Sequence, residues 1–239
     1  MIPTFVTPQL IANAYDIDDT TGHPRATQAA WSCGDRYFCP DDLRRYQTLL
    51  ELPIKPVNES YGSARSTEFC QQNRDACSEG NLDIQLMAGV ADTPTIFLYV
   101  LHTFANLLAT QLAQKSPPPL VISLSCGLDE EDVSNIEMDW FNTNAIKMGA
   151  IGVTIVAAAG DDGVTTSRSR GNPSKCRYNP LYPATSPYVL SVGGTQVCLN
   201  TTLEIFSFFP LFTIRLIHNM QYMLLAGSRE KPVGDCVSE

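Results

Sequence analysis

The stretch Leu120-Val121-Ile122-Ser123-Leu124-Ser125-Cys126-Gly127 is the segment around which the predicted fold is built. Its first six residues are mostly apolar and are followed by a cysteine and a glycine, as expected for a strand buried on both faces of a parallel sheet. Three prolines at 117–119 stop the helix predicted before it. The run therefore predicts a buried strand with a helix on its amino-terminal side.

Helices and strands alternate on both sides of this run. Apolar runs predict further strands at 95–100, 151–158 and 188–192. Helical spacing and proline starts predict helices from Pro8, from Pro40, and at 79–90, 102–115 and 132–148, the last ending before Gly149. We expect polar loops at 16–28 and 56–77. This order predicts an α/β fold, with helices on both faces of a parallel sheet and a site at the carboxyl ends of its strands.

Composition limits the class of protein. The chain has 239 residues, 44% hydrophobic and 17% charged, which is typical of a globular domain with a sizeable core. Its formal net charge is −9 and no Lys/Arg-rich run occurs, so we expect no nucleic-acid partner. Residues 203–226 are apolar on average, but charged residues and a proline interrupt them, so we expect no membrane span. The motifs Gly-x-x-x-x-Gly-Lys-Ser/Thr, Gly-x-Gly-x-x-Gly and Gly-x-Ser-x-Gly are absent, which argues against a nucleotide-binding domain and an α/β-hydrolase.

Eight cysteines and two glycosylation sequons indicate an oxidising, secretory compartment. The sequons are Asn58-Glu59-Ser60 and Asn200-Thr201-Thr202. The short loops from Cys33 to Cys39 and from Cys70 to Cys77 are candidate disulfides, and no pair has the Cys-x-x-Cys spacing of a zinc site. The opening Met1-Ile2-Pro3-Thr4 lacks the charged and apolar regions of a signal peptide, so we expect none in this chain.

Two carboxylates, Glu79 and Asp83, lie four residues apart in the run Ser78-Glu79-Gly80-Asn81-Leu82-Asp83-Ile84-Gln85. A four-residue step places them on one face of a helix, where like charges cost about 0.3 kcal/mol. Two interpretations are open. The acids either stabilise a helix N-terminus, where negative charge is favourable, or share a proton in a catalytic relay.

The carboxyl ends of the predicted strands carry further polar side chains. Asp161 lies in Gly160-Asp161-Asp162-Gly163, where the glycines permit a tight turn. This turn is either a simple Asx-turn or a holder for a functional carboxyl group. Ser123 and Ser125 either cap the strand or contact the backbone of a substrate. We assign structural roles to the three histidines, because none stands where a Ser-His-Asp triad needs it: His23, His102 and His218.

Four motifs follow one another along the chain. They are Glu-x-x-x-Asp at 79 and 83, Ser-x-Ser-x-Gly at 123–127, Ala-Ala-Ala-Gly-Asp-Asp-Gly at 157–163, and Tyr-Pro-Ala-Thr-Ser-Pro-Tyr-Val-Leu-Ser-Val-Gly-Gly-Thr at 182–195. Their order and spacing closely resemble those of the sedolisins, the serine-carboxyl peptidases. The opening Val6-Thr7-Pro8 also looks like the start of the family's catalytic domain. The resemblance covers residues 5–197 and implies a subtilisin-like fold that hydrolyses peptides at acid pH, as an endopeptidase or a tripeptidyl-peptidase.

The resemblance implies a role for each acid. In the family a Ser-Glu-Asp triad replaces Ser-His-Asp, which makes Glu79 the general base and acid toward a serine. Asp83 would orient Glu79 and share its proton, and Asp161 would be the acid of the oxyanion site. A carboxyl base works near its own pKa, so an acidic optimum follows. An oxyanion acid donates only when protonated, which burial and low pH both favour. The substrate-contacting residues would be Ser123, Ser125 and Gly127.

The sequence also departs from the family pattern. The family's nucleophile lies in a Ser-Gly-Thr-Ser motif downstream of the Gly-Gly-Thr strand, and the residues after Thr195 contain none, so no nucleophile is found. The family's calcium site and long propeptide have no counterpart either, so we expect no metal or cofactor in this chain. Cys126 stands where the family more often has an aromatic residue. Residues 198–239 resemble nothing in the family, and we interpret them as a non-homologous tail, either mistranslated or disordered.

The combined interpretation is a partial sedolisin catalytic domain at 5–197, incomplete at its C-terminus, truncated before the serine and inactive alone. Loss of the last part of the sheet would expose apolar strand edges and faces. The alternative is a non-catalytic protein that binds peptides in the same cleft. We expect a monomer that meets a peptide or protein substrate, with no nucleic acid and no membrane. The family implies a secreted or lysosome-like location.

Overall fold

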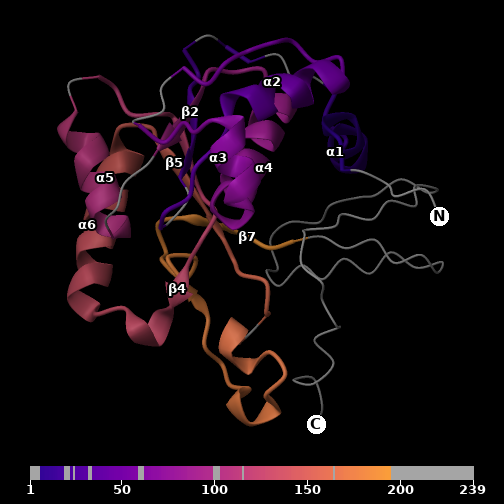
Figure 1. Cartoon of the computed structure of the whole chain (residues 1–239). Helices are drawn as coiled ribbons and strands as arrows, with labels where there is room; N and C mark the ends of the chain where they lie inside the picture. Colours follow the sequence, from indigo (N-terminus) through magenta and orange to yellow (C-terminus); the bar gives the residue numbers. More distant parts are fainter. Residues whose placement is uncertain are drawn as a thin grey trace.

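The computed structural model describes residues 6–18, 22–23, 25–31, 34–58, 62–98, 103–114, 116–163 and 165–194 (Figure 1). Its main element is a five-stranded sheet in the order β2-β1-β3-β5-β7, in which all neighbouring strands are parallel. The strands are β1 (Gln28–Trp31), β2 (Thr95–Leu98), β3 (Val121–Leu124), β5 (Thr154–Ala158) and β7 (Leu190–Val192). The helices are α1 (Pro8–Tyr15), α2 (Pro40–Leu49), α3 (Thr67–Gln72), α4 (Arg74–Val90), α5 (Phe104–Ala113) and α6 (Asn135–Ala150). The predicted α/β class and parallel sheet are confirmed.

One face of the sheet packs against α5 and α6. Side chains alternate along a strand, so Ile122 and Leu124 of β3 both point to this side, where they are buried. Phe141 of α6 is fully buried here, with its ring centroid 6.5 Å from that of Phe104 and 5.5 Å from that of Tyr182. These three rings form the aromatic centre of the larger core.

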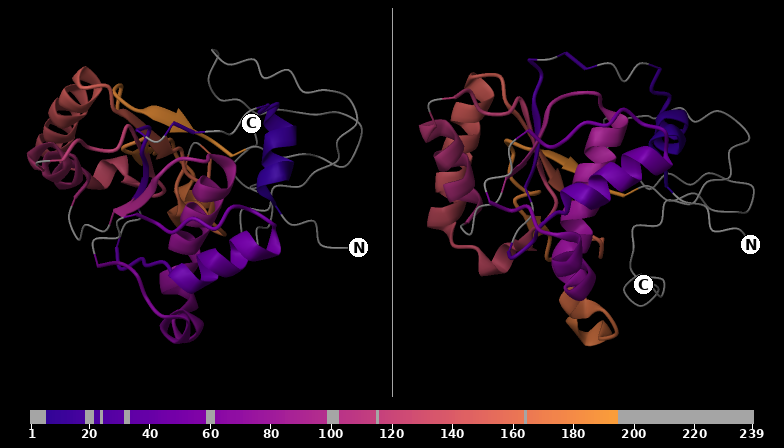
Figure 2. Two further views of the ribbon diagram at one scale, coloured as in Figure 1. Left: turned by 90° about the horizontal axis from the view of Figure 1, so that it is seen from above. Right: turned by 45° about the horizontal axis from the view of Figure 1, so that its top comes forward.

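The opposite face of the sheet packs against α2 and α4. Ala30 of β1 and Phe97 of β2 point to this side and are buried with Leu43 of α2 and Ile84 of α4. Figures 1 and 2 show α5 and α6 on one side of the sheet and α2 and α4 on the other. Helices therefore cover both faces, as predicted. Because the strands are parallel, their carboxyl ends all lie at one edge of the sheet.

Hydroxyl caps set the starts of several helices. Thr7 accepts a hydrogen bond from the N–H of Leu10 at 3.2 Å, and Pro8 opens α1 as predicted. Thr103 and Ser134 cap α5 and α6 in the same way. These caps place the starts of α5 and α6 at residues 104 and 135, slightly later than the predicted 102 and 132.

Two predictions about the first half of the chain are wrong. The segment 56–77 is not a continuous loop, because Ser66 caps α3 and α4 already begins at Arg74. The predicted loop at 16–28 runs directly into β1, a strand that the sequence did not predict. Only four residues long, β1 lies between β2 and β3. Its sequence Gln-Ala-Ala-Trp lacks the run of large apolar residues that marks the equally short β2 and β3, and its structure depends on pairing with both neighbours.

The end of α6 also differs from the prediction. The helix includes Gly149 and ends at Ala150, and the residue that takes a left-handed conformation beyond it is Gly152, with a φ of 87°. The strand predicted at 151–158 consequently begins at Thr154. The apolar stripe of α6 faces the core only in part, since Ile136 is 82% exposed.

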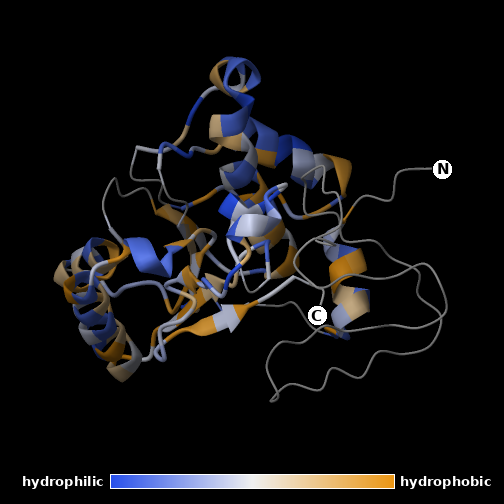
Figure 3. Ribbon diagram, turned by 90° about the horizontal axis from the view of Figure 1, so that it is seen from below, coloured by the Kyte–Doolittle hydropathy of each residue, from blue (hydrophilic) through white to orange (hydrophobic). Residues whose placement is uncertain are grey.

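The strand β7 forms one edge of the described sheet. Its register places Leu190 beside Val156 and Val192 beside Ala158 of β5, on the face away from α5 and α6. Leu190 and Val192 are 49% and 48% exposed. Figure 3 shows that the strands of the sheet are largely hydrophobic, whereas hydrophilic and hydrophobic residues alternate along the helices. The apolar side chains of β7 are thus partly exposed on this face of the sheet.

Several predictions fall outside the described residues. These are the tail at 198–239, the sequon at Asn200, the end of the strand at 99–100, and Cys33, His102 and His218. In the part of the chain that is described, no helix combines the length and the apolarity needed to cross a membrane.

Candidate active site

The helix α4 carries both predicted acids well inside its length. It starts at Arg74, so Glu79 is its sixth residue and Asp83 follows one turn later on the same face. The helix predicted at 79–90 is therefore too short at its start. The helix dipole acts within the first turn, and the acid that lies there is Asp75. The interpretation of Glu79 and Asp83 as stabilisers of a helix N-terminus is thus wrong.

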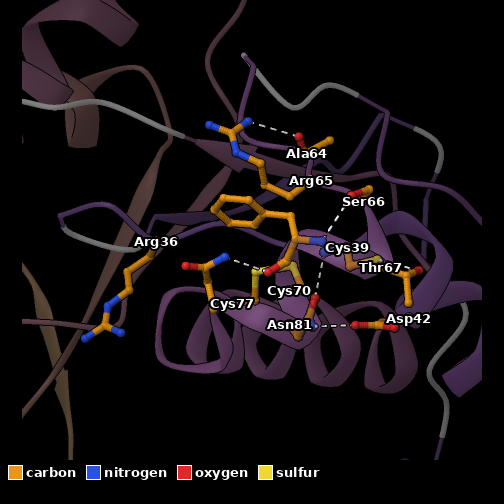
Figure 4. Close-up of a disulfide and its surroundings, with 12 residues drawn as sticks. Arg36, Cys39, Asp42, Ala64, Arg65, Ser66, Thr67, Cys70, Cys77 and Asn81 are labelled. Carbon is orange, nitrogen blue, oxygen red and sulfur yellow. Dashed lines mark hydrogen bonds between the residues drawn. A yellow bond between two sulfur atoms is a disulfide. The ribbon is translucent and has the colours of Figure 1, made fainter.

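A disulfide fixes the first turns of α4. Cys70 of α3 is bonded to Cys77 of α4, two residues before Glu79, as the short spacing predicted (Figure 4). Both cysteines are buried in one cluster with Cys39. The thiol of Cys39 is free, so the candidate pairing of Cys33 with Cys39 is wrong.

The backbone of the segment that follows β1 docks directly on α4. The N–H of Tyr37 donates to the carbonyl oxygen of Ala76 at 2.9 Å. Gly80 makes this approach possible, because a Cβ atom there would lie 2.2 Å from the carbonyl oxygen of Tyr37. The glycine next to Glu79 is therefore required by close backbone packing, at a place where a helix would otherwise favour alanine.

Asn81 forms the second link between this segment and α4. Its Oδ1 accepts a hydrogen bond from the N–H of Cys39 at 2.7 Å, and its Nδ2 donates to Oδ2 of Asp42 at 3.0 Å (Figure 4). Asn81 lies on the side of α4 opposite to Glu79 and Asp83, since two residues turn a helix by about 200°. The links therefore hold the helix with its two acids turned away from α2.

Asp83 lies against the end of β3. Its carboxyl group accepts a hydrogen bond from the side chain of Ser125. The backbone N–H of Ser125 in turn donates to the carbonyl oxygen of Trp31 at 3.2 Å, which continues the sheet ladder. Oδ2 of Asp83 is buried and has no hydrogen-bond partner among the described residues. Burial raises the pKa of Asp83 to about 7, opposed by the Ser125 hydrogen bond and reinforced by the charge of Glu79.

Glu79 lies between a cation and two acids. Nε of Arg36 is 3.6 Å from Oε2 of Glu79, and the two side chains are 38% and 32% exposed. Burial raises the pKa of Glu79, the charge of Arg36 lowers it, and the charge of Asp161 raises it. The charge of Asp161 thus acts on Glu79 from the turn after β5. The interacting acids Glu79 and Asp83 titrate as a coupled pair, which suits them to proton transfer.

The turn that carries Asp161 is tight, as predicted. Gly160 and Gly163 have φ values of 97° and 66°, which only glycine adopts readily. Asp161 itself is 74% exposed, with Oδ2 3.8 Å from a guanidinium nitrogen of Arg170. The buried acid of the turn is its neighbour Asp162, which accepts a hydrogen bond from Arg170 at 2.9 Å and anchors the turn.

The predicted substrate-contacting residues line the end of β3. Ser123 is partly buried and points to the α4 side of the sheet, opposite to Ile122. Gly127 precedes β4 (Leu128–Asp129), which pairs with β6 (Leu181–Tyr182). A Cβ atom on Gly127 would lie 2.9 Å from the carbonyl oxygen of Tyr182, so packing explains why this residue is glycine. Contact between these residues and a substrate stays a prediction.

Two arginines of the site carry no sequence signal. Arg36 and Arg170 lie in loops without a motif, and they meet Glu79 and Asp162 only when distant segments fold together. A cavity of about 410 Å³, lined partly by Lys55 and the first residue of β2, lies at the opposite edge of the sheet. Among the residues described, no group of three or more Asp, Glu, His or Cys side chains is placed to hold a metal ion.

No protein-family model matches the chain. Among curated proteins, it is 28% identical to physarolisin from Physarum polycephalum, over 83% of this chain and 36% of that protein. It is 28% identical to human tripeptidyl-peptidase 1 (80% and 34%) and 32% identical to kumamolisin from Bacillus sp. strain MN-32 (82% and 35%). The chain thus spans about a third of the length of these relatives.

The fold is similar to that of the serine-carboxyl proteinase sedolisin from Pseudomonas, solved in complex with pseudo-iodotyrostatin. The TM-score is 0.57 at 21% identity, and the match covers 80% of this chain and 54% of that one. This likeness shows the fold, and the subtilisin-like architecture predicted from the sequence is confirmed. Together with the relatives above, it supports the assignment of the chain to the sedolisin family of serine-carboxyl peptidases.

Proposed function

We propose that Glu79, Asp83 and Asp161 are the acidic residues of a serine-peptidase site that cleaves peptides at acid pH. The observation that carries the proposal is the meeting of three carboxyl groups from two distant segments. Glu79 and Asp83 lie one turn apart on α4, and the charge of Asp161 reaches Glu79 from the turn after β5. Ser125, a neutral residue just after β3, hydrogen-bonds to Asp83 at the same edge of the sheet.

The geometry supports a different role for each acid. Arg36 favours negative charge on Glu79, which suits Glu79 to accept the proton of a serine hydroxyl as general base. Asp83, whose pKa is about 7, keeps its proton under acid conditions and can share it with Glu79. Asp161 would stabilise the oxyanion of the tetrahedral intermediate, and it donates a hydrogen bond there only when it is protonated.

The nucleophile is the part of this mechanism that residues 1–239 do not supply. They contain no Ser-Gly-Thr-Ser sequence. We therefore propose that residues 1–239 do not hydrolyse peptides by themselves, and that the activity belongs to a product that joins these acids to a serine.

The test compares residues 1–239 with the product of the complete reading frame of the gene, on fluorogenic peptides between pH 3 and 7. We expect no hydrolysis by residues 1–239. In the complete product, Glu79→Gln should abolish acid-pH hydrolysis, while Glu68→Gln, at an exposed position of α3, should leave it unchanged. Activity of the complete product that survives Glu79→Gln would refute the role of Glu79. Acid-pH hydrolysis by residues 1–239 that Glu79→Gln abolishes would refute their inactivity.

The second candidate function is peptide binding without hydrolysis, and the missing Ser-Gly-Thr-Ser motif favours it for these residues. The measurement is fluorescence anisotropy of an unreactive labelled peptide at pH 4. A peptide aldehyde is a poor probe, because its binding depends on the serine. Binding that is lost in Asp161→Ala would support this function, and the absence of saturable binding would rule it out.

Peptides or proteins are the proposed substrates, and a secreted or lysosome-like compartment is the proposed location. The Cys70–Cys77 disulfide supports an oxidising compartment, as do Cys126 and Cys176, which are also disulfide-bonded. Mass spectrometry of protein isolated from its native compartment should find the Cys70–Cys77 bond intact; fully reduced thiols would contradict the location. We also propose a monomer, which light scattering after size exclusion would test directly.

A further inference from the structure

Arg36 contacts α4 at two points, one turn apart. Its guanidinium Nε lies 3.6 Å from Oε2 of Glu79. A terminal nitrogen of the same group donates to the backbone carbonyl of Asp75, four residues earlier on the helix. A planar guanidinium that makes both contacts has a defined orientation, which a flexible ammonium group would lack. Arg36 therefore has a fixed orientation beside the two acids of α4.

The backbone beside Arg36 is also held in place. Tyr37 donates its N–H to the carbonyl oxygen of Ala76 at 2.9 Å. The guanidinium of Arg65 lies over the Tyr37 ring, 3.9 Å from its centroid, and the Phe69 ring meets the Tyr37 ring edge-on at 5.7 Å. Figure 4 shows Arg36 and Arg65 on opposite sides of this docked segment. The position of Arg36 is thus set by packing and not by its ion pair alone.

The charges that face Glu79 come from three segments. Asp83 lies on α4 itself, Asp161 lies in the turn after β5, and Arg36 follows β1. The strands β1 and β2 and the helix α1 contain no charged residue. The neighbouring helix α3 carries Glu68, and α2 carries four charged residues, of which Asp42 reaches α4 through Asn81.

We propose that Arg36 is a positioning residue that keeps the negative charge of the Glu79–Asp83 pair on Glu79. The cation that contacts this pair is Arg36, at Glu79, whereas Asp161 is exposed and pairs with a different cation, Arg170. A charge on Asp83 would lie partly on Oδ2, a buried oxygen that has no hydrogen-bond donor among the described residues. A general base must be ionised to accept a proton, so a negative charge held on Glu79 suits that role. The catalytic consequence rests on the proposed function, whereas the charge distribution does not.

The size of the effect follows from exposure. Arg36 and Glu79 are each about a third exposed, so solvent screens part of their attraction. The strength of their ion pair is therefore that of a solvent-exposed ion pair. Removal of the Arg36 charge should then raise the titration midpoint of Glu79 by roughly half a pH unit. A lysine at this position keeps the charge but loses the two-point contact. The Glu79 midpoint in Arg36→Lys should therefore lie between those of the unmodified chain and Arg36→Gln.

The test is a carboxyl ¹³C NMR titration of residues 1–239, with Glu79 assigned by the loss of its signal in Glu79→Gln. We compare the unmodified chain with Arg36→Gln, Arg36→Lys and the control Arg44→Gln, whose arginine pairs with Asp41 on α2. We expect a higher Glu79 midpoint in Arg36→Gln, partial return in Arg36→Lys and no change in Arg44→Gln. An unchanged midpoint in Arg36→Gln, or an equal shift in the control, would overturn the proposal.

A second readout separates this proposal from the proposed function. In the complete gene product, Arg36→Gln should move the acid limb of kcat/KM upward by the same amount as the NMR midpoint. A fall in kcat with no displacement of that limb would assign Arg36 a purely structural role and overturn the proposal. A complete product without any hydrolysis would refute the proposed function alone, because the NMR titration needs no activity.

Discussion

Asp83→Asn should make the folded chain more stable at neutral pH. The carboxyl group of Asp83 is mostly buried, and its Oδ2 lacks a hydrogen-bond partner among the described residues. Its pKa is raised from an ordinary value of 3.8 to about 7, with burial as the main cause. Between these two values the folded state binds more protons than the unfolded state, so stability falls as pH rises. The amide of asparagine has a similar shape and no charge to bury.

The magnitude follows from the displacement of the pKa. Three pKa units at about 1.36 kcal/mol each give roughly 4 kcal/mol as the most that ionisation of Asp83 can cost the fold. The cost is absent below pH 3.8, grows between pH 3.8 and 7, and is complete above pH 7. The pKa of about 7 already includes the hydrogen bond from Ser125, which favours the charged form. We therefore expect Asp83→Asn to gain as much as ~4 kcal/mol at pH 8 and nothing at pH 4.

Urea unfolding at pH 4 and pH 8, followed by tryptophan fluorescence, measures this difference, since Trp31 is buried in the core. Asp139→Asn, at an exposed position of α6, is the control and should show no such pH-dependent gain. A variant Asp83→Asn that is equally destabilised at both pH values would refute the reasoning. That result would mean that Asp83 is stabilising as an ion and that its environment does not disfavour charge.

Three further predictions concern stability and are all measured by urea unfolding. Gly80→Ala should cost about 2 kcal/mol or more by driving a Cβ into a backbone carbonyl 2.2 Å away, whereas Gly149→Ala, in open space on α6, should gain about 0.5–1 kcal/mol; equal effects would contradict the close approach. Cys70→Ser should cost about 2–3 kcal/mol by opening a seven-residue loop, and an unchanged midpoint would mean that the bond is not formed. Phe141→Ala should cost about 3–5 kcal/mol because the ring is fully buried, while the exposed neighbour Trp140→Ala should cost far less; comparable losses would place the core elsewhere.

The features that the sequence predicts well are those carried by local pattern. The buried strands β2 and β3 appear as compact apolar runs, and α1 appears through Thr7 and Pro8, because the physical cause lies within the segment itself. The Cys70–Cys77 disulfide is of the same kind, since a short loop brings its two ends together. The tight turn at Gly160 follows from conformational freedom that glycine alone has.

The features that the sequence misses arise from contacts between distant segments. The strand β1 owes its structure to pairing with β2 and β3 on either side, and its four residues carry no periodicity. Arg36 lies 43 residues from its partner on α4, and nothing in either segment signals the contact. Likewise, the choice of Asp162 over Asp161 as the buried acid of its turn depends on Arg170.

The middle of α4 breaks local rules in a consistent way. Gly80 costs about 1 kcal/mol relative to alanine within a helix, and an asparagine at 81 is a poorer helix former than alanine. Asp83 adds a carboxyl group that is expensive to ionise. Each departure has a partner: Gly80 admits the backbone of Tyr37, Asn81 holds Cys39, and Asp83 reaches Ser125. The first two fix the rotation of α4, and that rotation places Glu79 beside Arg36. Residues that destabilise the isolated helix but together fix one geometry are expected at a functional site, because there the tertiary structure compensates for the local cost.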